Sequence, residues 1–159
     1  MSRIGIEHVR LTVDRPFDAF RTAFEGQLGH FHPGAYEALE HGDPQAARAG
    51  LESMAGPSGF MLFSTSDHGA VLRLVGTPGK AMHYLLGNPL IAVEMTRHAI
   101  GAALYAPLRV LLYEDGEGKT CVEYDLPSSL FGQFGDEHVD RVAESLDGRL
   151  EALIVEAAR

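Results

Sequence analysis

The longest apolar stretch of the chain covers residues 83–114, and its pattern predicts a strand, a short helix and a second strand. Asn88 can cap the helix, and Pro89 suits the first helical position because no N–H donor is needed there. Ile91 and Met95 are four residues apart, so they fall on one face of the helix. Polar residues occur almost only at the joints, and we therefore expect this stretch to form the centre of the core.

Alternating and helical periodicities predict further elements on both sides of this stretch. The predicted strands cover residues 3–13, 60–64, 70–75, 82–86, 104–114 and 120–126. Helices are predicted to begin near Pro16, Pro44 and Pro89, with a helical turn at residues 36–39 and a long helix over about residues 136–158. The apolar stripe of this last helix is expected to pack on the sheet or on a second copy of the chain.

Three details of the strands need special geometry. The apolar phase changes within residues 3–13, which predicts a bulge near Glu7 or His8. Residues 66–69 (Ser-Asp-His-Gly) are typical of a tight turn, so residues 60–75 are expected to form a hairpin. Pro107 cannot donate to a neighbouring strand, which favours an edge position or a bulge for residues 104–114.

The predicted strands and helices do not strictly alternate, and several strands follow one another directly. This order favours an α+β fold with a largely antiparallel sheet and helices on one face. The length of 159 residues is near that of one domain, and we expect residues 1–159 to form a single domain. No internal repeat and no long linker divides the chain.

Composition excludes several classes of function. A net charge of −9 with dispersed lysine and arginine makes nucleic-acid binding improbable. No uninterrupted apolar run approaches the roughly 18 residues that a membrane span needs, and we expect a cytoplasmic location. The single cysteine, Cys121, cannot form an intrachain disulfide and is expected to be an ordinary strand residue.

Five short motifs, taken in their order and spacing, resemble a known family. They are residues 59–63 (Gly-Phe-Met-Leu-Phe), 67–70 (Asp-His-Gly-Ala), 87–90 (Gly-Asn-Pro-Leu), 106–110 (Ala-Pro-Leu-Arg-Val) and 124–128 (Tyr-Asp-Leu-Pro-Ser). The chain resembles, over about residues 34–130, the family called domain of unknown function 302. The resemblance implies a TATA-binding-protein-like α+β fold, with a curved antiparallel sheet, helices on one side and frequent dimers. It implies no activity, and it leaves the N-terminal strand and helix and the final helix as extensions.

Candidate chemistry gathers at the rim of the central stretch. If the strands there are neighbours, His83, His98, Tyr105 and Asp125 could converge at one end of the sheet. A histidine near Asp125 could then act as a general base, or a histidine could ligate a haem iron. The alternative is structural, since a histidine at a helix end contacts carbonyl groups and an aspartate before Leu-Pro suits a turn.

Two other motifs have mainly structural interpretations. Gly87, Asn88 and Pro89 are explained as a turn, a cap and a helix start, and the alternative is that free N–H groups after Pro89 receive an anion. His30 and His32 are the closest histidine pair, but no third ligand has recognisable spacing, so we expect no metal site.

Three functions follow from these observations. The first is a binding module that takes a small hydrophobic ligand between sheet and helices, with Asn88, Tyr105, Ile91 and Met95 as candidate contacts. This cavity is expected among apolar residues of the strands and of the helix after Pro89: Phe60, Leu62, Leu72, Leu86, Ile91, Met95, Val110 and Leu112. The second is an enzyme that uses His83, His98 and Asp125. The third is an assembly domain whose final helix pairs with its twin, and we expect a homodimer in each case.

Overall fold

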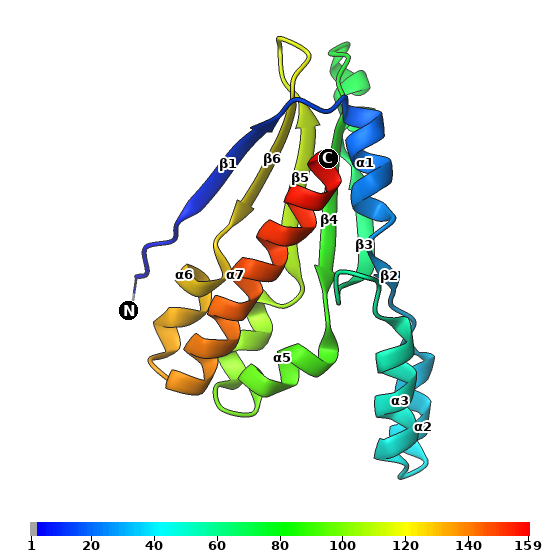
Figure 1. Cartoon of the computed structure of the whole chain (residues 1–159), viewed down its shortest axis with the longest axis vertical. Coiled ribbons are helices and arrows are strands. Elements are labelled where there is room, and N and C mark those ends of the chain that lie inside the picture. The colour runs from blue at the N-terminus through cyan, green and yellow to red at the C-terminus, as the bar shows by residue number, and fades with distance from the viewer. Residues whose placement is uncertain (1–2) are drawn as a thin grey trace.

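One sheet of six strands forms the centre of the molecule, in the order β1-β6-β5-β4-β3-β2. A computed structural model describes residues 3–159 (Figure 1). The strands are β1 (His8–Val13), β2 (Gly29–His30), β3 (Met61–Asp67), β4 (Ala81–Gly87), β5 (Leu108–Glu114) and β6 (Thr120–Asp125). Every neighbouring pair is antiparallel except β2 and β3, which are parallel.

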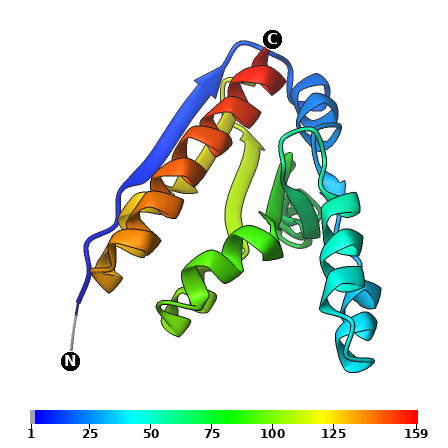
Figure 2. The same cartoon turned by 60° about the horizontal axis from the view of Figure 1, so that its bottom comes forward.

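Helices cover one side of this sheet, except for one short helix that contacts His83 on the other side, and short 3-10 segments connect several helices. The α-helices are α1 (Phe17–Glu25), α2 (Glu37–Glu40), α3 (Pro44–Met54), α4 (His68–Leu72), α5 (Pro89–Thr96), α6 (Pro127–Phe131) and α7 (Glu137–Ala158). The 3-10 segments are η1 (Pro33–Tyr36), η2 (Arg73–Val75), η3 (Ile100–Tyr105) and η4 (Gly132–Phe134). Figure 2 shows α1, α5 and α7 on the same side of the strands. These features confirm the predicted α+β class and the largely antiparallel sheet.

The core lies between the sheet and the helices. Alternate residues of the central strands point toward the helices, and Tyr84, Val110 and Val122 are all fully buried there. α1 contributes a phenylalanine stripe, with Phe20 and Phe24 completely buried. α7 buries a stripe that contains Leu146, Leu150 and Leu153, so this helix packs on its own sheet.

The local helix signals are confirmed. Asn88 accepts a hydrogen bond from the N–H of Leu90 at 2.9 Å and caps α5, and Asp43 caps α3 in the same way through Ala46. Pro44 and Pro89 occupy the first turns of these helices. Within residues 3–159 no helix combines the length and the apolar character that a bilayer crossing requires.

The N-terminal strand is shorter than predicted. It begins at His8, and residues 3–7 form no strand. β1 cannot begin earlier because its partner strand ends there: β6 stops at Asp125 and Pro127 begins α6. The predicted bulge is therefore wrong, and the phase change marks the point where pairing ends.

The predicted hairpin of residues 60–75 is also wrong. β3 pairs with β4, and residues 68–72 form helix α4. Asp67 caps this helix by accepting a hydrogen bond from the N–H of Ala70 at 2.8 Å, and Gly69 does not use a left-handed conformation. Residues that are typical of a turn here begin a helix, since the same side chains serve both purposes.

Pro107 lies just outside the strand that it was expected to interrupt. β5 begins at Leu108 and lies between β4 and β6, so the predicted edge position is wrong. Residues 100–105 form η3, and a cis peptide bond joins Ala106 to Pro107. A proline that precedes the first strand residue removes no hydrogen bond from the ladder.

Candidate functional site

The three candidate catalytic residues do not meet in one site. His83 lies between the buried Met82 and Tyr84, so it points to the sheet face that the helices leave open. Asp125 follows the buried Tyr124 and points to the same face. His98 lies just after α5, where its ring stacks on that of His138 of α7 at 4.5 Å.

His83 has its own surroundings on the open face. Its ring contacts His68 of α4 edge-on, with 6.0 Å between the ring centres. The pKa of His83 is lowered from its ordinary value by burial first, and then by the charges of His68 and Arg109. His83 is therefore half-buried beside another histidine, away from Asp125.

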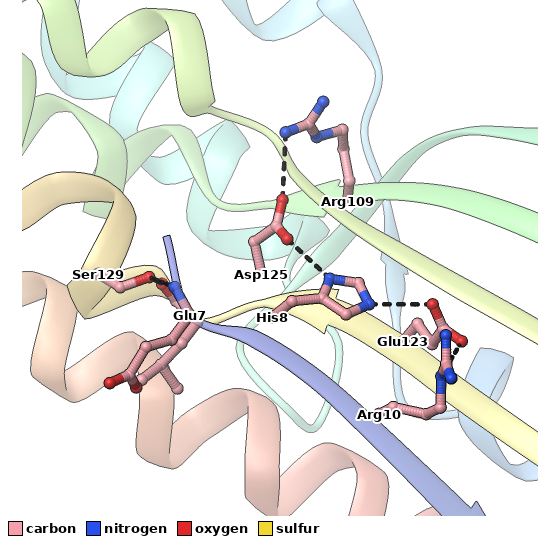
Figure 3. Close-up of polar contacts among 8 residues, drawn as sticks. Glu7, His8, Arg10, Arg109, Glu123, Asp125 and Ser129 are labelled. Atoms are coloured by element: carbon pink, nitrogen blue, oxygen red, sulfur yellow. Dashed lines mark hydrogen bonds and ion pairs between the residues drawn. The ribbon is translucent and has the colours of Figure 1, made fainter. Parts of the chain in front are cut away.

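Asp125 binds a different histidine, His8 of β1 (Figure 3). The His8 Nδ1 lies 3.0 Å from Asp125 and its Nε2 lies 2.9 Å from Glu123. Arg109 approaches the other oxygen of Asp125 at 3.4 Å. Because β1 pairs with β6 in register from His8 opposite Asp125, the imidazole lies directly over these two carboxylates.

Both ring nitrogens of His8 face carboxylate oxygens. An ionised carboxylate can accept hydrogen bonds but cannot donate them. Each nitrogen must therefore carry a proton to satisfy both contacts. The pKa of His8 is raised by the hydrogen bond to Asp125 and then by that to Glu123. A doubly protonated imidazole has no lone pair that could accept a proton from a substrate, so this geometry does not provide a general base.

Glu123 is the hub of the same cluster. It accepts hydrogen bonds from the Tyr113 hydroxyl and from Arg10, each at 2.6 Å, in addition to His8. The Tyr113 hydrogen bond is the largest of the causes that lower the pKa of Glu123 to about 2, and the pKa of Tyr113 is raised in return. These contacts join β1, β5 and β6, and the cluster of His8, Arg10, Tyr113, Glu123 and Asp125 is best described as an ionic clamp.

An apolar cavity of about 260 Å³ lies where β4 ends and α5 begins. Its lining comes from η1, β3, α5, η3, the segment before β5, α6 and α7, which close around the end of the sheet. The lining residues include Tyr36, Phe63, Ile91, Met95, Pro107 and Phe131. We call this space the apolar cavity.

The structure brings three of the four candidate ligand contacts to this cavity. Asn88, Ile91 and Met95 line it, but the Asn88 amide already donates to the Gly59 carbonyl at 2.9 Å and caps α5. Tyr105 is not in the lining, because its ring packs edge-on against Phe131 and Phe134. The four candidate ligand contacts are therefore divided between two environments.

Most other residues expected around a cavity fill the core. Phe60, Leu86, Val110 and Leu112 are completely buried in it, and Leu72 is exposed on α4. Phe63 is a lining residue that the periodicity did not indicate. The register shift between Leu62 and Ser64 places it, and no sequence signal marks this bulge within an unbroken apolar run.

Within the histidine pair of residues 30 and 32, His32 has a structural role. His32 Nδ1 accepts a hydrogen bond from the N–H of Gly34 at 3.0 Å and caps η1. Across residues 3–159, no group of three or more His, Cys, Asp or Glu side chains is arranged to hold a metal ion.

The fold and these sites define an α+β protein with one mostly antiparallel sheet, helices on one face, an ionic clamp on the other and an apolar cavity at one end. The model of the family "Domain of unknown function DUF302" matches residues 36–157, and the chain belongs to this family. The match includes nearly all of α7, so the family region extends further than residues 34–130.

The fold is similar to that of a solved structure. It is the crystal structure of an uncharacterized conserved protein DUF302 from Bacillus stearothermophilus, which is 16% identical with a TM-score of 0.66. The alignment covers 94% of this chain and 97% of that chain. No curated protein matches the sequence.

Proposed function

We propose that this protein binds a small apolar ligand in the apolar cavity. The observation that carries the proposal is the lining, in which Phe63, Ile91, Met95 and Phe131 surround a space that is already open. Ligand sites are typically concave and mostly apolar, with few polar groups that orient the ligand. The hydroxyl groups of Tyr36 and Thr96 are the polar groups that could do so here.

The volume limits the size of the ligand. A cavity of about 150 Å³ is enough to take up benzene, whereas drug-sized ligands occupy pockets of about 300–1,000 Å³. The apolar cavity, at about 260 Å³, lies between these classes. A bicyclic aromatic molecule or a short alkyl chain is the size of ligand that we expect.

The lining favours binding over the alternatives of an enzyme or a haem protein. Tyr36 is its only ionisable side chain among the residues that the structure describes, so the cavity has no acid–base pair. None of the described lining residues is a histidine that could ligate a haem iron. The assembly alternative loses its main support, because the apolar stripe of α7 packs against the sheet.

The test is a titration of the full chain with indole, followed through the methyl NMR signals of Ile91 and Met95. We expect saturable shifts confined to methyl groups around the cavity. Ala92→Phe places a ring in the cavity and should weaken binding by about tenfold or more, since a filled cavity leaves no room for the ligand. Ala49→Phe, on the exposed side of α3, is the matched control and should bind like the native chain.

Circular dichroism of both variants checks that they are folded. Shifts spread over the whole surface, or equal indole affinity in Ala92→Phe and Ala49→Phe, would contradict the proposal. The same titration with n-octanol distinguishes a flat aromatic cavity from one that prefers an alkyl chain.

A further inference from the structure

A second hollow, of about 360 Å³, lies between α5 and α7. It shares Ile91 with the apolar cavity, but its other lining residues are different and mostly polar. They are Leu90, Ile91, Glu94, Arg97, His98, His138, Arg141, Val142, Ser145 and Arg149. We call this hollow the arginine groove.

The charge of the arginine groove is opposite to that of the whole chain. The chain has a net charge of −9, yet three arginines and one carboxylate, Glu94, line the groove. Arg97 pairs with Glu94 at 3.5 Å. Within residues 3–159, no carboxylate lies within ion-pair distance of Arg141 or Arg149, so two positive charges remain uncompensated.

The stacked histidines make the groove still richer in donors. Arginine can only donate hydrogen bonds, so the contacts of Arg97 with His98 (3.2 Å) and of Arg141 with His138 (2.8 Å) define both rings as acceptors. The accepting atoms are His98 Nε2 and His138 Nδ1, which therefore carry no proton. The remaining nitrogen of each ring carries the proton. It is Nδ1 in His98, which lies 3.9 Å from Asp136, and Nε2 in His138.

We propose that the arginine groove binds the phosphate monoester group of a small molecule. Guanidinium groups donate two parallel hydrogen bonds to phosphate oxygens, and His138 Nε2 adds a neutral donor. Leu90, Ile91 and Val142 supply an apolar part of the lining against which the rest of the ligand packs. This site is independent of the apolar cavity and of the ligand proposed for it.

Charge matching favours phosphate over a carboxylate. A phosphate monoester carries a charge of about −1.5 to −2 near neutral pH, which matches the two uncompensated arginines. A carboxylate would leave one of them unneutralised. A long nucleic acid would meet the acidic remainder of the chain, so a small ligand fits the charge distribution better.

The experiment is a calorimetric titration of the full chain with glycerol 3-phosphate at neutral pH and low ionic strength. The double variant Arg141→Gln/Arg149→Gln should bind at least about tenfold more weakly, because it loses charge-assisted hydrogen bonds. The matched control is Arg48→Gln/Arg73→Gln, which changes the net charge equally at exposed positions away from the groove. The control should keep the native affinity.

A sedimentation assay with vesicles of phosphatidylcholine and phosphatidic acid separates two sources of the phosphate. Vesicle binding that needs Arg141 and Arg149 assigns a lipid headgroup, and binding of glycerol 3-phosphate alone assigns a soluble ligand. The proposal would be overturned if the chain bound neither glycerol 3-phosphate nor the vesicles. It would also be overturned if acetate bound as tightly as phosphate, or if the double variant and its control had equal affinities.

Discussion

Glu123 of β6 accepts hydrogen bonds from side chains of β1 and β5, and its contribution to stability depends on pH. The pKa of Glu123 is 4.5 when unperturbed and about 2 in the fold, so its stabilisation is present above pH 4.5 and is lost as the pH falls toward 2. His8 acts in the opposite direction. Its pKa is raised above 6.5 in the fold, so its stabilisation is present below pH 6.5 and is lost as the pH rises through the raised value.

The first prediction follows from the opposite pH dependences of Glu123 and His8. Glu123→Gln should lower the free energy of unfolding by about 1–3 kcal/mol, since it weakens hydrogen bonds to charged partners. The difference from the native chain should be largest between pH 4.5 and 6.5, where both groups of the clamp are charged. Urea unfolding across the pH range measures this difference.

Glu117→Gln is the control for this measurement, because Glu117 is 78% exposed in its ion pair with Lys119. Its effect on stability should be small at every pH. A difference between native chain and Glu123→Gln that stays constant from pH 2 to 8 would contradict the clamp.

At the residue scale, the sequence suggested that His83 and His98 could converge on Asp125, but the histidine that contacts Asp125 is His8. His8 lies 117 positions away, and only the pairing of β1 with β6 brings the two together. His83 and His98 were nearer in sequence, yet strand alternation and the helix layer separate them from Asp125. Which side chains share a site depends on strand order, which local patterns do not define.

Asn88 joins two elements, and its two roles can be separated by mutation. Asn88→Asp keeps the oxygen that caps α5 but loses the donor to the Gly59 carbonyl. Asn88→Ala loses both, which should lower the unfolding free energy by about 1–3 kcal/mol in total. Thermal unfolding should therefore rank the proteins as native, Asn88→Asp, Asn88→Ala.

Asp43→Ala, which removes only the cap of α3, is the comparison for this series. It should cost about 0.5–2 kcal/mol. Equal melting temperatures of Asn88→Asp and Asn88→Ala would show that the cap contributes nothing and would contradict this assignment.

The backbone at Gly29 packs directly against the backbone at Gly56, which leaves no room for a side chain at either position. A Cβ atom at Gly29 would lie 2.6 Å from the backbone nitrogen of Gly56, which no flexible side chain can relieve. We expect Gly29→Ala to lower the unfolding free energy by about 1–3 kcal/mol through overpacking. Gly148→Ala should instead raise it by about 0.5–1 kcal/mol, because Gly148 lies in the middle of α7 and alanine favours helix.

Chemical denaturation of both glycine variants measures these opposite effects. A loss of stability in Gly148→Ala comparable to that in Gly29→Ala would contradict the steric explanation. The close packing of Gly29 against Gly56 was not predictable, since residues 29–57 contain no periodic signal that places one backbone against the other.

At the element scale, signals that act within a few residues were sufficient. Asn88 and the two prolines Pro44 and Pro89 predicted helix starts correctly, and the stripe of α7 predicted its buried face. The errors arose where one residue type serves two structures. Asp67 caps a helix where a turn was expected, and Pro107 precedes a central strand where an edge was expected.

At the scale of the whole molecule, the expected homodimer stays a prediction. Light scattering of the full chain should give twice the mass of 17.2 kDa if the prediction is right. The stripe of α7 that could have paired with a twin is used within the chain, so such a dimer would need another surface. A mass of one chain at micromolar concentration would contradict it.

The last prediction concerns how stability is distributed between the arm formed by α2 and α3 and the rest of the molecule. Figure 1 shows this arm extending beyond one end of the sheet, and α3 buries only Ala47 and Leu51. α7 is also a helix but buries a continuous stripe against the sheet.

Because local opening is easiest where few apolar contacts are broken, amides of α3 should exchange with solvent through local opening, with little dependence on urea. Amides of α7 and β5 should exchange only through global unfolding, with a steep dependence on urea. Hydrogen exchange followed by mass spectrometry measures both, and equal exchange free energies in α3 and α7 would show instead that the arm unfolds together with the sheet as one cooperative domain.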